Sequence, residues 1–273
     1  MSKTTVANAN LTRRALIGGA TVTLANANVA RPARAQSAAK TFVLVHGAAC
    51  GGWIWRRVAD LLEKQGCKVF APTFTGLGER SHLLTKAVGL DTHVTDIVNV
   101  VRWESLDGIC LVAHSYAGWP CGAALDRLGD KVASIVWLDA FKPEDGRKLA
   151  DLVAEPMRKT IESATAKGEL GIPAPTELPP SFVDPRDEAF VRAKLTPHPI
   201  ATYSHPLRYA GALERIAKKT YVRLPNFTNP AFDQAYAACK ADPSWSTAEL
   251  ADCGHLAMLD APERLAALLL KAA

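Results

Sequence analysis

The chain has 273 residues, 48% of them hydrophobic, so it is long enough for one large α/β domain or two small ones with a sizeable core. Its formal net charge of +5 comes from residues 1–35, which contain basic but no acidic side chains. Outside that stretch the two signs are equal in number, and a neutral domain gives no support for nucleic-acid binding.

Residues 1–35 have the pattern of an export signal of the twin-arginine type. A polar region ends in Thr12-Arg13-Arg14, an apolar segment follows over 15–30, and Ala33-Arg34-Ala35 forms a small-x-small cleavage site. The apolar segment is short and contains two asparagines, which disfavours a membrane-spanning helix. We therefore expect a mature chain that begins near Gln36, has no stable membrane insertion, and works in the periplasm or outside the cell.

Six cysteines are scattered along the chain without a C-x-x-C pair or metal-ligand spacing, so we expect no metal site. Cys67 and Cys110 fall in predicted buried strands, where they are expected to be packing residues. An oxidising compartment permits a disulfide, for instance between two of Cys50, Cys239 and Cys253, and the spacing does not select a pair.

An alternation of strands and helices begins at residue 41. The apolar strand 41–46 leads into residues 47–53, a loop so rich in small residues that its backbone N–H groups can approach a ligand. A helix over 54–65, a strand over 67–71 and a helix over 91–104 follow. This rhythm predicts a parallel sheet with helices on both faces.

The third strand ends at a corner occupied by Ser115. Residues 109–113 are all apolar, which predicts a strand buried on both faces, and residues 116–128 have a helical period. A strand-to-helix elbow exposes its serine Oγ above the sheet and requires small neighbours, usually the glycines of G-x-S-x-G. Ala113 and Ala117 take those places here. We interpret Ser115 as a catalytic nucleophile, the alternative being an ordinary strand-turn-helix with a serine cap.

The second half of the chain continues the pattern after an interruption. A fourth strand over 133–138 delivers Asp139 at its carboxyl end. Ten prolines between 143 and 206 prevent that stretch from supplying central strands, so we place it outside the sheet as a cap. The remaining predicted elements are a helix over 207–218, a strand over 220–224, a helix over 230–240, a strand over 245–250 and a helix from Pro262.

These motifs, in this order, resemble the α/β-hydrolase superfamily, and most closely small bacterial carboxylesterases related to the plant methyl-esterase and hydroxynitrile-lyase branch. The resemblance covers nearly all of residues 41–271 outside the cap. It implies one α/β domain over 36–273, with a mostly parallel six-stranded sheet flanked by helices and an inserted cap at about 143–206. It also places the second, first and third strands side by side. The matching segments are FVLVHGAACGGWIW, FTGLGERSHLL, GLDTHVTDIVNVV, LVAHSYAG, VWLDAF and CGHLAMLDAPERLA.

A serine nucleophile needs a base, and the base needs an acid that fixes its tautomer. His255 lies in the loop after the last predicted strand, where the resemblance implies the catalytic histidine. One arrangement in the superfamily puts the acid after the fifth strand, but residues 225–229 contain no carboxylate. The other arrangement puts it after the fourth strand, where Asp139 stands. We favour Asp139 and retain Asp233 as the alternative.

The tetrahedral intermediate of an ester hydrolysis carries a negative oxygen that backbone donors must stabilise. The resemblance assigns this oxyanion hole to the N–H groups of Ala48 and Tyr116. Several aromatic residues could line an apolar substrate pocket, and we select Trp119, for which plain core packing is the competing interpretation.

The leading hypothesis is a serine carboxylesterase that needs no cofactor and hydrolyses small hydrophobic esters through an acyl-enzyme on Ser115. The expected partner is a small-molecule ester, and the oligomeric state is not predicted. Hydroxynitrile lyases of similar sequence place a lysine directly after the catalytic histidine, whereas this chain has Leu256. Such a lyase, another cofactor-free enzyme of this fold, and a non-catalytic binding protein on the same scaffold remain the alternatives.

Overall fold

The computed structural model describes residues 39–273, so the predicted export signal lies outside the described residues. Its centre is a six-stranded sheet in the order β2-β1-β3-β4-β7-β8, in which every neighbouring pair is parallel. The expected adjacency of the second, first and third strands is confirmed. The strands are β1 (Thr41–Val45), β2 (Lys68–Phe70), β3 (Ile109–His114), β4 (Val132–Leu138), β7 (Lys218–Arg223) and β8 (Trp245–Glu249).

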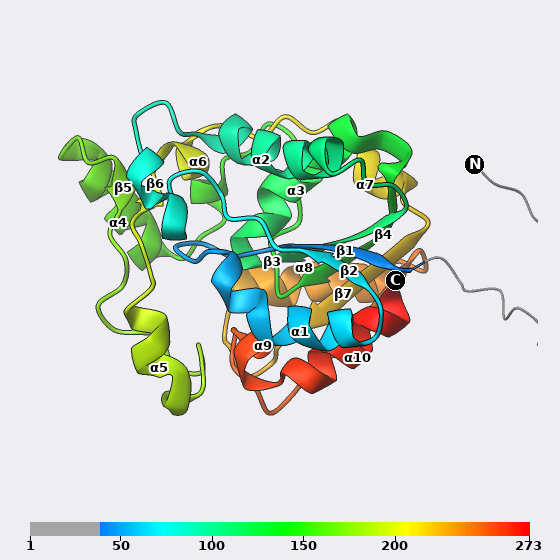
Figure 1. Ribbon diagram of the computed structural model, residues 1–273. Coiled ribbons are helices and arrows are strands. Elements are labelled where there is room, and N and C mark those ends of the chain that lie inside the picture. Colours follow the sequence, from blue (N-terminus) through cyan, green and yellow to red (C-terminus); the bar gives the residue numbers. More distant parts are fainter. Residues whose placement is uncertain (1–38) are drawn as a thin grey trace, which may run out of the picture. The chain divides into compact units, whose positions relative to one another are not determined.

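Helices cover both faces of this sheet (Figure 1). α2 (Leu90–Trp103), α3 (Gly118–Leu128) and α8 (Pro230–Ala241) pack on one face. α1 (Arg56–Lys64) and α10 (Pro262–Ala272) pack on the other, together with the short α9 (Ala257–Asp260). The architecture is therefore the three-layer α/β arrangement that the alternating sequence predicts.

The middle strands are apolar throughout because both of their faces are covered. In β3, Leu111 belongs to the core on the α2–α3 side, whereas its neighbours Cys110 and Val112 belong to the core on the α1–α10 side. Alternate side chains of a strand point to opposite faces, so a continuous apolar run is what a doubly covered strand requires. The same alternation occurs in β1 and β4.

The proline-rich segment 143–206 contributes no strand to the large sheet. It lies beyond one end of the sheet, on the left of Figure 1. We call this segment the cap. It contains α4 (Glu155–Ala166), α5 (Pro185–Arg192), α6 (Ala201–Ser204) and a small antiparallel pair of β5 (Gly171–Ile172) with β6 (His198–Pro199).

The helix predicted over 207–218 is wrong, because only a single turn forms there, α7 (Ala212–Arg215), before β7 begins at Lys218. Gly211 precedes this turn with a φ of 81°, a left-handed conformation that interrupts any longer helix. The Asp126 carboxylate of α3 accepts the backbone N–H groups of Ala210 and Ala212. A tertiary contact thus replaces the helical hydrogen bonds of this segment.

All six cysteines are free, so none of the disulfides that an oxidising compartment would permit is formed. Five are buried and Cys67 is partly buried. Burial raises the pKa of the Cys50 thiol to about 12 and that of Cys110 to about 11. These two thiols are therefore neutral packing groups near pH 7.

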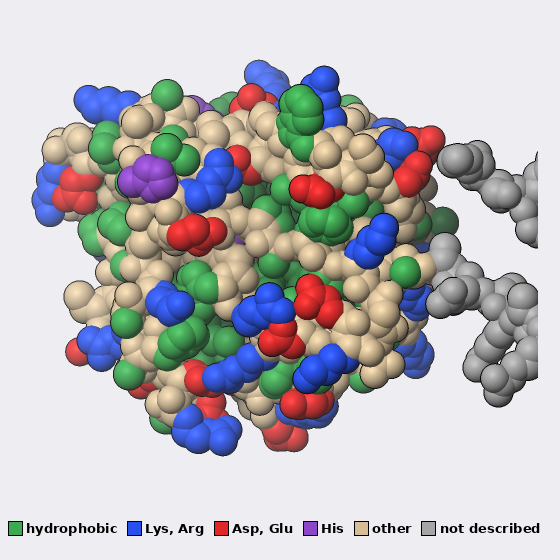
Figure 2. Space-filling model, viewed as in Figure 1, with side chains coloured by type: hydrophobic (Ala, Val, Ile, Leu, Met, Phe, Trp, Pro, Cys, Tyr) green, Lys and Arg blue, Asp and Glu red, His purple; other side chains and the backbone are tan. Residues whose placement is uncertain are grey.

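The surface of the described residues is mixed in charge. Figure 2 shows Lys and Arg interspersed with Asp and Glu over the visible face, in keeping with a domain whose charges balance. Large hydrophobic side chains are exposed only at Leu83, Trp103, Leu170 and Phe190 within residues 39–273. No helix in this part of the chain has the length and apolar character needed to cross a membrane.

Candidate active site

Ser115 stands at the corner between β3 and α3 with a φ of 56°. Small residues make this close approach possible. A Cβ at Gly118 would lie 2.1 Å from the Phe141 carbonyl oxygen, and a Cβ at Gly47 would lie 3.0 Å from the Ser115 Cβ. The chain therefore forms the tight strand-to-helix corner that the sequence predicts, while the role of Ser115 as nucleophile remains a prediction.

Asp139 and His255 form a direct hydrogen bond in which His255 Nδ1 donates to Asp139 Oδ2 over 2.8 Å. Asp139 follows β4 directly and is fully buried, and His255 lies in the loop between β8 and α9. A carboxylate only accepts, so the proton of the neutral imidazole is on Nδ1 and the lone pair is on Nε2. This is the tautomer that a general base for a serine hydroxyl requires.

Asp233, the alternative acid, makes no hydrogen bond to His255 in the described structure. Its side chain is 60% exposed, and it pairs with Arg223, whose Nε donates to Asp233 Oδ1 over 2.9 Å. The same Arg223 donates from Nη1 to Asp139 Oδ1 over 2.6 Å. Sequence reasoning missed Arg223, although an arginine within the apolar run TYVRL was a signal that its charge would need a buried partner.

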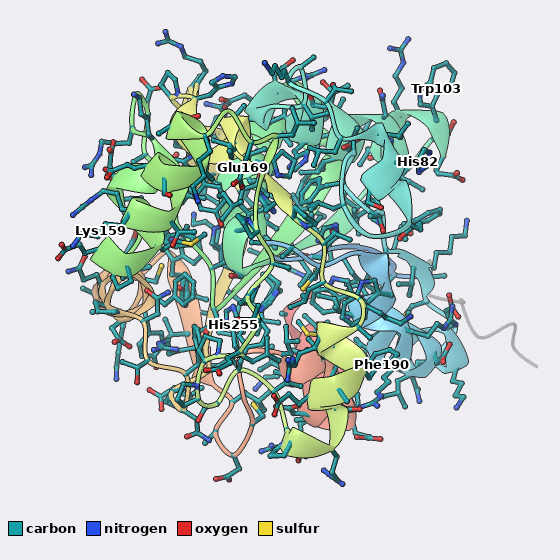
Figure 3. The ribbon with its side chains drawn as sticks, turned by 90° about the vertical axis from the view of Figure 1, so that its left-hand side faces the viewer. His82, Trp103, Lys159, Glu169, Phe190 and His255 are labelled. Carbon is teal, nitrogen blue, oxygen red and sulfur yellow. The ribbon has the colours of Figure 1, made fainter. Side chains whose placement is uncertain are left out.

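The His255 ring is packed among other rings. Phe227 stacks on it with a centroid distance of 4.3 Å, and Phe182 of the cap lies 5.5 Å away. His114 lies 4.5 Å away and donates from Nε2 to the His255 carbonyl oxygen. In the view of Figure 3, His255 appears between α4 and α5, at the end of the molecule where the cap lies. Burial lowers the pKa of His114 well below its usual value, so this neighbour stays neutral.

The predicted oxyanion-hole residues lie in the two connections that follow β1 and β3. Ala48 is in the loop after β1, and Tyr116 directly follows Ser115. The cap holds the loop after β1 at Ala49, whose N–H donates to His198 Nδ1 over 3.1 Å and whose carbonyl accepts from the Thr196 N–H over 3.0 Å. The position of the Ala48 N–H therefore depends on hydrogen bonds made by the cap.

The side chain of Tyr116 belongs to a buried polar network. Its hydroxyl donates to His93 Nδ1 over 2.8 Å, and His93 Nε2 donates to the Thr75 carbonyl over 3.0 Å. On the cap side, His198 Nε2 donates to Thr202 Oγ1 over 3.0 Å. Burial lowers the pKa of His93 to about 3 and that of His198 well below its usual value. Both histidines are thus neutral, and their protons are fixed by their partners.

Trp119 is the predicted substrate-binding residue, and the structure gives it a place in the core. Its side chain is fully buried in the cluster between the sheet and α2–α3, and its indole Nε1 has no hydrogen-bond partner in the described residues. Buried indole N–H groups usually find a partner, so this one is an exception. Packing explains the position of Trp119, and its contact with a substrate remains a prediction.

Left-handed backbone conformations gather at the carboxyl edge of the sheet. Ala49, Ser115, Asp139 and Asp252 follow β1, β3, β4 and β8, and their φ values lie between 46° and 59°. Non-glycine residues in this region cost on the order of 1–3 kcal/mol each and cluster at functional sites. The strained backbone positions therefore lie at the same carboxyl edge of the sheet that carries Ser115, Asp139 and His255.

The position after His255 is filled by Leu256, which is fully buried in the apolar cluster beneath α10. No lysine ammonium therefore stands where the similar hydroxynitrile lyases are expected to carry one. Residues 39–273 also contain no group of three His, Cys, Asp or Glu side chains arranged to hold a metal ion.

Comparison with known families gives this geometry a context. Residues 42–268 match the model of the alpha/beta hydrolase family. The chain belongs to this family. Among its curated alpha/beta hydrolase relatives, a carbendazim hydrolyzing esterase from Nocardioides is 35% identical over 235 residues, which span 82% of this chain and 96% of that protein. Salicylic acid-binding protein 2 from Nicotiana tabacum is 28% identical, over 86% of this chain and 97% of that protein.

The alpha/beta hydrolase fold also recurs among solved structures. An extracellular alpha/beta-hydrolase from Paenibacillus superposes with a TM-score of 0.75, at 22% identity, over 85% of this chain and 98% of that one. A methylesterase from Arabidopsis gives a TM-score of 0.66 at 23% identity over similar shares of both chains. Both likenesses concern the fold.

Proposed function

We propose that this alpha/beta hydrolase is a serine carboxylesterase that hydrolyses small hydrophobic esters. The proposal draws on the esterases among its relatives and on one observation in particular, the 2.8 Å hydrogen bond from His255 Nδ1 to Asp139 Oδ2. That bond leaves the Nε2 lone pair of a buried histidine available on the edge of the sheet where Ser115 stands. An enzyme of this family needs such a base to use a serine hydroxyl near neutral pH.

In the proposed mechanism, His255 Nε2 takes the proton of the Ser115 hydroxyl as Oγ attacks the ester carbonyl. The Asp139 carboxylate stabilises the imidazolium, and the N–H groups of Ala48 and Tyr116 stabilise the negative oxygen. His255 then gives its proton to the departing alcohol, leaving an acyl group on Ser115. A water molecule then attacks the acyl carbonyl as His255 Nε2 takes its proton, the bond between the acyl carbon and Ser115 Oγ breaks to release the carboxylic acid, and His255 returns the proton to Oγ.

The proposed substrate class follows from the apolar surroundings of the reacting histidine. Phe182 of the cap and Phe227 after β7 both contact the His255 ring. An environment of this kind favours an ester with apolar or aromatic groups over a charged polymer. Because one relative is named as a carbendazim hydrolyzing esterase, carbendazim is a compound to include among the candidates.

The test is hydrolysis of a p-nitrophenyl ester series with acyl chains from two to twelve carbons, together with carbendazim, by the purified protein and by Ser115→Ala. We expect turnover by the parent and a loss of at least about a thousandfold in the variant. Ser204→Ala serves as the matched control, because it removes a hydroxyl from the cap and leaves Ser115 in place. Equal rates for the parent and Ser115→Ala on every compound would refute the proposal.

We further propose that the protein is exported and works in the periplasm or outside the cell, on the strength of the twin-arginine pattern in residues 1–35. Replacing both Arg13 and Arg14 by lysine should abolish export when the chain is expressed in a host with a twin-arginine system. Cell fractionation, with N-terminal sequencing of the exported form, would check this. A mature N-terminus far from Gln36 would contradict the predicted cleavage site.

A further inference from the structure

Arg223 is a charged residue that the proposed chemistry does not use, yet it is almost completely buried beside the reacting groups. It is the last residue of β7, and 4% of its side chain is exposed. All three guanidinium nitrogens donate hydrogen bonds. Nη1 reaches Asp139 Oδ1 and the Leu224 carbonyl, Nη2 reaches the Phe227 carbonyl and Asp233 Oδ1, and Nε reaches Asp233 Oδ1, all within 2.6–2.9 Å.

These contacts divide the two oxygens of Asp139 between two tasks. Oδ1 accepts from Arg223 Nη1 over 2.6 Å and from the Leu224 N–H over 3.1 Å. Oδ2 accepts from His255 Nδ1 over 2.8 Å. With Oδ1 held by two donors, the carboxylate cannot rotate without breaking both hydrogen bonds, so Oδ2 stays directed at the histidine.

Asp233 lies at the other end of the same guanidinium. It comes from the first turn of α8, and its side chain is 60% exposed, in contrast to the fully buried Asp139. Burial works against the charge of Arg223, but the two carboxylates outweigh this effect and raise the pKa of its guanidinium. Arg223 therefore stays positive, and the positive charge is shared between one buried and one exposed acid.

We propose, building on the proposed function, that Arg223 is a positioning residue for Asp139 and that Asp233 adjusts, through Arg223, the pH at which His255 accepts its proton. A positive charge behind Asp139 draws its negative charge away from His255 and disfavours the imidazolium. Asp233 opposes this by neutralising part of the Arg223 charge. The carboxylate that the sequence offers as an alternative acid then acts on the site indirectly, through the arginine.

The direction of each effect follows from the charges that face His255. These are Asp139 and, behind it, Arg223 and Asp233; Asp260 lies near through its hydrogen bond from the Gly254 N–H. His114, which packs on the ring, is neutral because burial lowers its pKa. Removing the Arg223 charge should let His255 take up its proton at higher pH, and removing the Asp233 charge should move the uptake to lower pH.

The experiment follows the His255 ring by NMR over a pH series and, in parallel, the pH dependence of kcat/KM on a p-nitrophenyl ester. The variants are Arg223→Gln, Arg223→Lys and Asp233→Asn. Asp242→Asn is the matched control, because Asp242 is an exposed acid at the other end of α8 that has no contact with Arg223. The NMR series needs no turnover, so it tests this proposal even if the ester hydrolysis fails.

For Arg223→Gln we expect the midpoint of the His255 titration to rise by about one pH unit, and kcat to fall at least about tenfold. Arg223→Lys keeps the charge without the forked geometry, so the midpoint should stay near that of the parent while kcat falls. For Asp233→Asn the midpoint should fall by about 0.3 units at low salt and by less at 0.5 M NaCl, since an exposed charge is screened.

Opposite shifts in Arg223→Gln and Asp233→Asn, with Asp242→Asn unchanged, would support the proposal. Shifts of the two variants in the same direction, or the absence of a shift in one or both of them, would overturn it. If Arg223→Gln does not fold, the other two variants still test the proposal, because both retain a cation at position 223. A lower His255 midpoint in Asp233→Asn, with an unchanged midpoint and a lower kcat in Arg223→Lys, would support it, and any other result would overturn it. An inactive parent whose His255 titration nevertheless responds as expected would refute the proposed function and leave this inference in place.

Discussion

Asp139 directly follows β4 and Arg223 is the last residue of the adjacent strand β7, and their side chains meet over 2.6 Å although 84 residues separate them in the chain. Ser115 follows the next strand on the other side, β3. Three neighbouring parallel strands thus deliver a hydroxyl, a carboxylate and a guanidinium to one edge of the sheet. His255 reaches the carboxylate from beyond β8, across the end of β7.

Replacing Asp139 by asparagine should lower kcat by about a thousandfold or more. The amide would leave His255 in the wrong tautomer and would no longer stabilise its positive form. Asp233→Asn also removes one negative charge, but from the exposed carboxylate that pairs with Arg223. It should change kcat by no more than about threefold at the optimal pH. Steady-state kinetics of the two variants check this. A larger loss of kcat in Asp233→Asn than in Asp139→Asn would indicate that Asp233, the alternative from the sequence, is the acid.

Ser115→Gly should be more stable than Ser115→Ala by about 0.5–1 kcal/mol. Both lose the hydroxyl, but only glycine adopts a φ of 56° without steric cost, and this gain exceeds the extra freedom that glycine has in the unfolded chain. Urea unfolding of the two variants measures the difference. An alanine variant that is equal to or more stable than the glycine variant would show that the corner is not strained.

His198→Phe should lower kcat roughly tenfold to a hundredfold with little change in KM. The substitution removes the acceptor of the Ala49 N–H and so releases the loop that carries the Ala48 donor. His198→Asn keeps an acceptor near the Nδ1 position and should recover most of the activity. His205→Asn, at an exposed histidine of the cap, is the control. If the phenylalanine variant raised KM alone, the cap residue would serve substrate binding instead.

The free energy of unfolding should fall steeply as the pH drops below about 6.5. Burial lowers the pKa of His46 to about 4 and that of His93 to about 3, and it also lowers those of His114 and His198. The unfolded chain protonates these histidines near pH 6.5, so between pH 6.5 and about 4 it binds more protons than the folded chain. Four such groups give a slope of up to about 5 kcal/mol per pH unit.

Urea unfolding at pH 7.5, 6.5 and 5.5 measures this dependence. The stabilisation should be fully present above pH 6.5 and should decrease toward the lower folded-state pKa values. His82→Asn alters an exposed histidine and should leave the slope unchanged. A free energy of unfolding that stays constant from pH 7.5 to 5.5 would mean that these histidines take up protons over the same pH range in the folded protein as in the unfolded chain.

Most of the sheet could be predicted because its strands are read from local patterns. The apolar run over 109–113 requires burial on both faces, and the small residues around Ser115 require a tight corner. Both properties belong to a few consecutive residues. The pairing of β5 with β6 was not predictable in this way, because each strand has two residues and the partners come from distant parts of the cap.

The polar surroundings of the site were harder to predict for a related reason. A buried arginine destabilises the fold unless carboxylates pair with it. The carboxylates that pair with Arg223 lie 84 residues before it and ten residues after it. His198 likewise has a role only because Ala49, 149 residues earlier, directs its N–H toward the ring. Sequence patterns indicate which residues are unusual, whereas their partners emerge from the fold.

The parallel direction of the strands has a practical consequence. All six strands run the same way, so the chain enters β1 at Thr41 on the edge of the sheet opposite to the one that carries Ser115, Asp139 and His255. Lys40, just before this entry, donates to the carbonyls of Leu270 and Ala273 and so ties the start of β1 to the end of α10 at that side. Attachment of the domain to a solid support near Lys40 or Ala273 would therefore leave the edge that carries Ser115, Asp139 and His255 facing the medium.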